Sequence, residues 1–234
     1  MKRKIYLNEF NIPTNDTVYL PYSSGLMRAY AETREEIRNN FEFQNFLFIR
    51  DTLENILGQY DDADVAAFSC SVWNFELSLR LAEELKKKYP GVLIIFGGPQ
   101  TPKEKGDFFE KYPFIDIGIF GEGERCFADI LIRSLTEDLR GKHEIISRDD
   151  TNVDLDIFPS PYTAGLYEYL FNKHKDIKFK AIVETNRSCP FMCTFCFWGK
   201  GSEIRKITYH SLDYIQKEAE WLGNHKIEYS FCAD

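Results

Sequence analysis

The sequence has no long apolar run. None of its stretches approaches the roughly 18 consecutive apolar residues that a membrane-spanning helix requires. The basic start, Met1–Lys4, is followed only by Ile5, Tyr6 and Leu7 before polar residues return, which is too short for a signal-peptide core. We therefore expect a cytoplasmic protein with no membrane partner.

Blocks of basic residues are also lacking. The chain has 29 Lys and Arg residues against 37 Asp and Glu residues, giving a net charge of −8, and the two signs are interspersed. Nucleic-acid-binding domains concentrate positive charge on one face, so we expect no nucleic-acid partner. Hydrophobic residues make up 44% and charged residues 28%, which is typical of a folded globular protein.

Cysteine is sparse, with six residues in the chain. In the reducing cytoplasm such cysteines remain thiols or bind metals, and disulfides are rare. The spacing of the cysteines therefore becomes informative about metal chemistry.

Residues 1–140 alternate between short apolar runs and helix-like segments. The expected strands are Lys4–Leu7, Asn45–Ile49, Val65–Cys70, Val92–Phe96 and Ile115–Phe120. The expected helices are Tyr22–Arg38, Thr52–Leu57, Phe75–Lys88, Lys103–Lys111 and Arg125–Leu135. This alternation predicts an α/β fold with a doubly wound parallel sheet of flavodoxin-like or Rossmann-like type, in the strand order 2-1-3-4-5.

The carboxyl ends of the expected strands carry small residues. Ligands of open α/β sheets bind beyond these ends, and glycine lets a flat ligand approach the backbone closely. The alternative is that these glycines only form tight turns. These strand ends are Ser69–Ser71, Gly97–Pro99 and Gly121–Glu124.

A second unit is expected after a linker. Residues 141–178 form the predicted linker, where Pro159 and Pro161 prevent a continuous helix. From residue 179 to residue 234 the pattern returns to strand and helix. The expected elements are a strand at Ala181–Thr185, a helix from the capping residue Ser211 to Leu222, and a strand at Ile227–Phe231.

Three cysteines follow the first of these strands. Cys189, Cys193 and Cys196 have the spacing C-x3-C-x2-C. Three thiolates can hold three irons of a [4Fe–4S] cluster and leave the fourth iron open to a substrate. Structural zinc normally takes four ligands, and His210 or Cys232 could supply a fourth. A zinc-stabilised interaction protein and inert thiols therefore remain alternatives.

The sequence around these cysteines resembles the radical S-adenosylmethionine (SAM) superfamily, and in particular the subgroup with an N-terminal cobalamin-binding domain. The similar segments are Pro159–Tyr162, Glu184-Thr185, Cys189–Phe191, Cys193–Cys196, Trp198-Gly199 and, in the front part, Tyr19–Gly25. The chain departs from the pattern at Ser188, where glycine is usual, and at Phe197, where a polar residue is frequent. The Asp-x-His-x-x-Gly cobalamin-ligand motif is absent.

The resemblance implies three cofactors. A [4Fe–4S] cluster on the three cysteines would bind SAM, with Phe195 beside the adenine, and would cleave it reductively to a 5′-deoxyadenosyl radical. Cobalamin would bind the front domain without a histidine ligand and supply a methyl group to an unactivated carbon. Its candidate contacts are Ser69, Ser71, Trp73, Gly97, Gly98, Gly121 and Gly123. The implied partners are a small-molecule or peptide substrate and an electron donor such as flavodoxin or ferredoxin, and the catalytic residues are unknown.

Other outcomes stay open at this point. The resemblance also permits a non-methylating rearrangement or cyclisation, or a truncated cofactor-binding module without turnover. A radical SAM barrel needs about six βα units, or roughly 200 residues by analogy with complete barrels. We therefore expect residues 179–234 to be the start of a partial (β/α) barrel, the chain to be part of a longer enzyme, and its two barrel strands to form an isolated pair.

Overall fold

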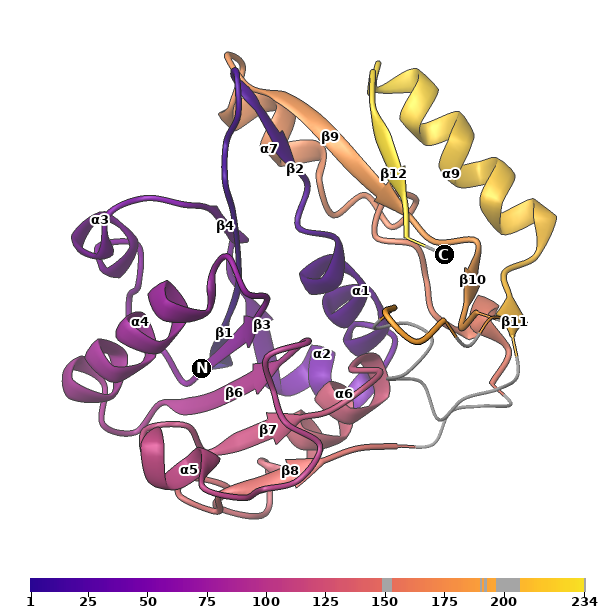
Figure 1. The fold of residues 1–234 in the computed structure, drawn as a ribbon. Coiled ribbons are helices and arrows are strands. Elements are labelled where there is room, and N and C mark those ends of the chain that lie inside the picture. The colour runs from indigo at the N-terminus through magenta and orange to yellow at the C-terminus, as the bar shows by residue number, and fades with distance from the viewer. Residues whose placement is uncertain (149–152, 190, 192, 197–206, 234) are drawn as a thin grey trace. The chain divides into compact units, whose positions relative to one another are not determined.

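The computed structural model describes residues 1–148, 153–189, 191, 193–196 and 207–233. The chain divides into two compact units (Figure 1). The first unit comprises residues 1–13 and 23–148, and the second comprises residues 14–22 and 149–234.

The first unit contains a parallel β-sheet. Its strands are β1 (Arg3–Asn11), β3 (Phe41–Phe43), β4 (Leu47–Ile49), β5 (Val65–Ser69), β6 (Leu93–Gly97), β7 (Ile117–Ile119) and β8 (Glu144–Ile146). Their order is β3-β1-β5-β6-β7-β8, and β4 also pairs with β1. The predicted order 2-1-3-4-5 is confirmed, with β8 as an additional strand at the far edge.

Helices cover both faces of this sheet. They are α1 (Tyr22–Ala31), α2 (Glu35–Asn40), α3 (Leu53–Leu57), α4 (Phe75–Lys88), α5 (Phe108–Lys111) and α6 (Glu124–Arg133). Figure 1 shows α3, α4 and α5 on one face and α1, α2 and α6 on the other. Tyr6 and Phe10 of β1 share a core with Leu81 and Leu85 of α4. This confirms the doubly wound fold.

The predicted helix Tyr22–Arg38 is two helices. The Thr33 hydroxyl donates to the carbonyl of Tyr30, and Arg34 is extended with φ −88° and ψ 121°. A side chain that bonds its own backbone competes with the helix, so the chain turns at this point before α2 begins.

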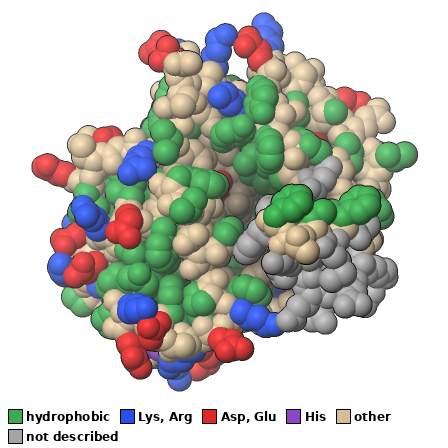
Figure 2. Space-filling view, in the orientation of Figure 1, with side chains coloured by type: hydrophobic (Ala, Val, Ile, Leu, Met, Phe, Trp, Pro, Cys, Tyr) green, Lys and Arg blue, Asp and Glu red, His purple; other side chains and the backbone are tan. Residues whose placement is uncertain are grey.

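Acidic and basic side chains are interspersed over the face of the first unit that Figure 2 shows. Within the described residues, no helix has the length and apolar character needed to cross a membrane.

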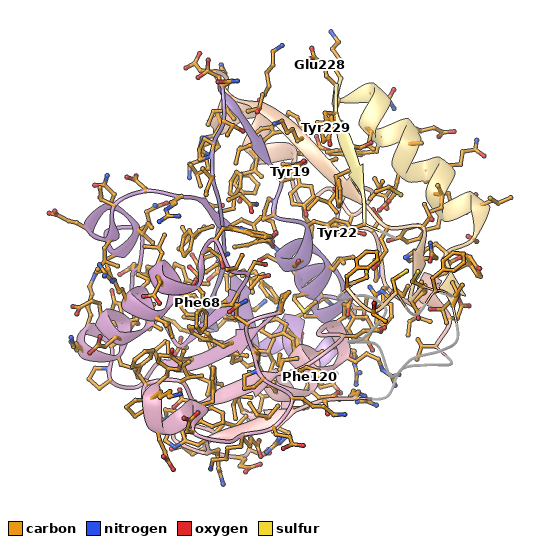
Figure 3. All side chains as sticks on the ribbon, viewed as in Figure 1. Tyr19, Tyr22, Phe68, Phe120, Glu228 and Tyr229 are labelled. Carbon is orange, nitrogen blue, oxygen red and sulfur yellow. The ribbon has the colours of Figure 1, made fainter. Side chains whose placement is uncertain are left out.

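The second unit contains a small parallel sheet of β2 (Thr17–Tyr19), β9 (Lys178–Val183) and β12 (Ser230–Cys232), in the order β12-β9-β2. Strand β2 comes from the segment between β1 and α1. The expected isolated pair is therefore corrected to three strands, because the chain places a short early segment beside β9. Figure 3 shows the side chains of Tyr19 and Tyr229 turned toward one another, and their ring centroids are 6.3 Å apart.

Two helices and an antiparallel ladder complete the described part of this unit. They are α7 (Glu168–Lys173), α9 (Leu212–Asn224), β10 (Asn186–Arg187) and β11 (Thr208–Tyr209). Residues 141–178, predicted as a linker, carry β8, a 3₁₀ turn at Leu155–Ile157, and α7. Trp221 of α9 packs against Tyr162 with ring centroids 5.0 Å apart, and its indole N–H donates to Glu168 of α7 at 3.1 Å.

Candidate functional site

The turn after β5 is shaped by Asn74. Its amide N–H donates to the carbonyl of Ser69 at 2.9 Å, and its side-chain oxygen accepts from the backbone N–H of Ser71 at 2.8 Å. Val72 and Trp73 lie in the turn between these contacts, and their side chains are 76% and 52% exposed. The turn therefore presents apolar side chains at the carboxyl end of β5.

The turn after β6 packs directly against the turn after β5. Ser69 and Gly97 are register partners, and the backbone N–H of Cys70 donates to the carbonyl of Gly97 at 2.7 Å. Gly98 has φ +92°, and a Cβ there would lie 2.8 Å from the carbonyl oxygen of Cys70. Only glycine fits this position. Burial raises the pKa of the Cys70 thiol, which makes this cysteine a core residue rather than a reactive one.

The turn after β7 leaves open space. Gly121 has φ +82°, and a Cβ added there would meet no atom within 4 Å. A Cβ on Gly123 would instead lie 3.0 Å from the sulfur of Met27 on α1. The carboxyl edge of the sheet thus offers bare backbone at Gly121, two strands away from the exposed turn of β5, and a flat ligand can approach the backbone there closely.

The structure brings most of the sequence-predicted contacts to this one edge. Ser69, Gly97 and Gly98 lie side by side, and Gly121 and Gly123 follow the neighbouring strand β7. Ser71 and Trp73 belong to the turn that Asn74 holds. Sequence reasoning missed Asn74 itself, although an asparagine just before a helix signals a side chain that bonds nearby backbone.

Sequence reasoning also missed Glu9, a carboxylate inside the apolar strand β1. It is 7% exposed, and its Oε2 accepts from the backbone N–H of Ser24 at 2.7 Å. Burial raises the pKa of Glu9 to about 7, against the lowering effect of hydrogen bonds from its neighbours. The available signal was an acidic residue at an otherwise buried strand position.

The second candidate site is the loop with Cys189, Cys193 and Cys196. The three thiols are free, Cys193 is exposed and the other two are partly exposed. The backbone N–H of Cys196 donates to the carbonyl of Cys193 at 3.1 Å, so a tight turn joins these two residues. Phe195, in this turn, is 91% exposed.

The three cysteines fit an iron–sulfur cluster by their chemistry, because they are accessible soft ligands on a short loop. In the parts of the chain that the structure describes, no three Cys, His, Asp or Glu side chains are grouped closely enough to hold a metal ion. That statement covers His210 and Cys232, the two possible fourth zinc ligands. Phe197, Trp198 and Gly199 lie outside the described residues.

The base of this loop is held firmly. Strands β10 and β11 pair as an antiparallel ladder, with Arg187 opposite Thr208. The Arg187 guanidinium donates to Glu184 at 3.0 Å and lies over the ring of Phe158 at 5.1 Å. Ser188, next to this base, has φ +79°. The loop therefore departs from β10 through a left-handed residue, at the position where the resemblance expects glycine.

A buried acid lies near this base. Glu218 of α9 is 1% exposed, and its carboxyl group lies beside the hydroxyl groups of Ser160 and Tyr214. Burial, more than the charge of Glu184, raises the pKa of Glu218 to about 7. Among the described residues, neither oxygen of Glu218 makes a hydrogen bond of ordinary geometry.

Known proteins match the chain in both of its units. Residues 38–131 match the B12 binding domain family. The chain is 32% identical to the 2-(S-pantetheinyl)-carbapenam-3-carboxylate methyltransferase of Streptantibioticus cattleyicolor, over 99% of this chain and 35% of that protein. It is 34% identical to the cobalamin-dependent radical SAM methyltransferase TokK of Streptomyces tokunonensis, with the same coverage of each chain.

A further relative has a different activity in its name. The anaerobic magnesium-protoporphyrin IX monomethyl ester cyclase of Synechocystis is 27% identical over 52% of this chain and 27% of that protein. The chain spans about a third of the length of the two methyltransferase relatives. With the B12 binding match and the cysteine spacing, these similarities show that the chain is similar along nearly its whole length to part of a cobalamin-dependent radical SAM methyltransferase.

Proposed function

We propose that this chain is the cofactor-binding part of a cobalamin-dependent radical SAM enzyme that methylates an unactivated carbon. The observation that carries the proposal is the presence, in one chain, of the C-x3-C-x2-C loop and a sheet edge with bare backbone that matches the B12 binding domain. Two relatives that match along 99% of the chain bear the name methyltransferase.

Cys189, Cys193 and Cys196 would hold the [4Fe–4S] cluster, which supplies the electron for reductive cleavage of SAM. The β10–β11 ladder and the Glu184–Arg187 pair would fix the base of their loop. Phe195 is exposed and can cover a flat adenine face.

The carboxyl edge of the first sheet would hold cobalamin, which supplies the methyl group. Gly97, Gly98 and Gly121 offer backbone without side chains, and the β5 turn adds Ser71 and Trp73 as lateral contacts. The first unit has one histidine, His143, which directly precedes β8 and so lies at the opposite edge of the sheet, and we therefore expect cobalamin to bind without a histidine ligand from this unit.

The test of the radical chemistry is anaerobic reconstitution with iron, sulfide, SAM and a reductant. One electron delivered to SAM gives methionine and the 5′-deoxyadenosyl radical, and 5′-deoxyadenosine is measured after that radical takes up hydrogen. We expect it from the wild-type chain and from Cys232→Ala, the matched control, and none from Cys193→Ala. A fully loaded cluster without 5′-deoxyadenosine from the wild type would contradict the proposal.

The test of cobalamin binding is its retention through desalting. Gly121→Val should lose the cofactor, because its side chain fills the open space at the sheet edge. Gly141→Val is the matched control, since Gly141 also has a positive φ, +67°, and open surroundings but follows α6 at the other end of the sheet. Equal retention of cobalamin by both variants would show that cobalamin does not bind at this edge.

The similarity to the cyclase supports a second candidate function, which is a cyclisation without methyl transfer. The two are separated by the products formed from SAM. Both reactions release methionine and 5′-deoxyadenosine from SAM, but only methyl transfer also releases S-adenosylhomocysteine.

A further inference from the structure

Glu9 is a buried acid within a strand, with 7% of its surface exposed. It occupies β1, where the preceding residues Ile5, Tyr6 and Leu7 are all buried. A buried carboxylate that lacks a cationic partner is unfavourable when charged. The contacts that hold it are neutral: the backbone and hydroxyl group of Ser24, the backbone of Ser23 and the side chain of Asn11.

The contacts of Glu9 join two segments that lie on either side of β2 in the sequence. The chain leaves the first unit after Pro13, forms β2 beside β9 in the second unit, and returns at Ser23. Glu9 lies shortly before the exit and Ser24 just after the return. The 2.7 Å hydrogen bond from the Ser24 N–H to Glu9 therefore ties the first turn of α1 to the carboxyl end of β1.

The same helix contacts the candidate cobalamin edge one turn later. Met27 follows Ser24 by three residues, and its sulfur lies 3.0 Å from the position that a Cβ on Gly123 would occupy. A shift of the start of α1 would move Met27, and with it the backbone of the turn after β7. Glu9 is thus linked through Ser24 and Met27 to one of the candidate cobalamin contacts.

We propose that Glu9 is a positioning residue for the cobalamin site, acting through the start of α1 on Met27 and Gly123. This inference rests on the proposed binding of cobalamin by the first unit. The carboxylate form accepts from all of its neighbours, and protonation replaces one acceptor with a donor. The charged side chains further along the helical segment, Arg28 and Glu32, pair with each other at 2.9 Å and leave Glu9 to its neutral contacts.

The experiment compares the wild-type chain, Glu9→Gln and Glu32→Gln. The last makes the same chemical change on the same helical segment, where Glu32 pairs with Arg28. Cobalamin is titrated into each protein at about pH 6 and about pH 8, one unit on either side of the ionisation of Glu9. The thermal midpoint of the cobalamin-free protein is measured under the same conditions.

We expect wild-type affinity for cobalamin to fall roughly five- to ten-fold from the higher to the lower pH, as for loss of one hydrogen bond. Glu9→Gln should bind weakly at both pH values, while Glu32→Gln should follow the wild type. The thermal midpoint of Glu9→Gln should stay equal or rise at the higher pH, because the buried charge is gone. Weaker binding without lower stability distinguishes a positioning role from general structural damage.

Two results would overturn the inference alone. One is wild-type affinity in Glu9→Gln at both pH values, and the other is a loss of affinity that follows a fall in thermal midpoint. A wild-type chain that binds no cobalamin at either pH would instead overturn the proposed function together with this inference.

Discussion

At the scale of single residues, Ser188 adopts a backbone conformation that favours glycine, although it carries a side chain. Its φ of +79° lies in the left-handed region, which disfavours every residue with a Cβ. We predict that Ser188→Gly raises the free energy of unfolding of the metal-free protein by about 1 kcal/mol, because the strain is removed. Chemical denaturation measures the change.

The matched control for that prediction is Ser230→Gly in β12. Ser230 is exposed, and it is absent from the positive-φ residues of the described chain. Glycine in a strand lowers stability by about 0.5–1 kcal/mol. A fall in stability for Ser188→Gly as large as that for Ser230→Gly would show that the left-handed conformation does not persist in solution.

We predict that the stability of the second unit depends on pH, because Glu218 is buried there. Its pKa rises from 4.5 to about 7 on folding, mainly through burial, so between these values the folded state holds a proton that the unfolded state has lost. Stability therefore falls as the pH rises from about 4.5 to 7. Glu218→Gln should remove this contribution and leave the similar contribution of Glu9, and it should be more stable than the wild type above pH 7, by up to about 3 kcal/mol.

Glu220→Gln is the control on the same helix, because Glu220 is exposed and accepts a hydrogen bond from the Gln216 side chain at 2.9 Å. Thermal midpoints of the three proteins between about pH 5 and pH 8 measure the effect. A slope in Glu218→Gln as steep as that of the wild type would show that Glu218 takes up no proton on folding.

At the scale of elements, strand β2 and the side chain of Tyr162 both bond to the edge of β9 that faces away from β12. Strand β2 pairs with β9 from Lys178 to Lys180. Beyond it, the hydroxyl group of Tyr162 donates to the carbonyl of Ile182 at 2.5 Å and accepts from the N–H of Ile182 at 3.1 Å. One phenol thus satisfies both backbone groups that a neighbouring strand would otherwise bind.

We predict that Tyr162→Phe lowers the stability of the second unit by about 1–3 kcal/mol, because two partly buried backbone groups lose their partner. Hydrogen exchange should show faster exchange of the Ile182 amide. Tyr209→Phe in β11 is the control, since Tyr209 is 64% exposed. Unchanged protection of Ile182 in Tyr162→Phe would mean that another group, or water, replaces the hydroxyl.

Elements with strong apolar patterns could be predicted from the sequence, and short ones could not. The runs that became β1, β5, β6 and β7 are apolar and buried, and their order follows from the βα alternation. Strands β2 and β8 have three residues each, and β8 includes the polar Glu144. Strands of this length depend on the partner they pair with, which the local sequence does not reveal.

At the scale of the whole molecule, the chemistry of the sites was more predictable than their geometry. The cysteine spacing and the glycine-rich strand ends are visible in the sequence, and the sheet gathers the second group at one edge. The hydrogen bond between Glu9 and Ser24 joins residues 15 positions apart, whose proximity only the fold creates, whereas Asn74 and Arg187 bond to residues within five positions of them in the sequence.

The central claim of this account is that Cys189, Cys193 and Cys196 hold an iron–sulfur cluster. The most direct test is the iron content and visible spectrum of the anaerobically reconstituted chain. We predict about four irons per chain and a brown colour that air bleaches, retained in Cys232→Ala and lost in Cys193→Ala. A colourless wild-type protein with stoichiometric zinc, or iron content that Cys193→Ala leaves unchanged, would contradict the claim.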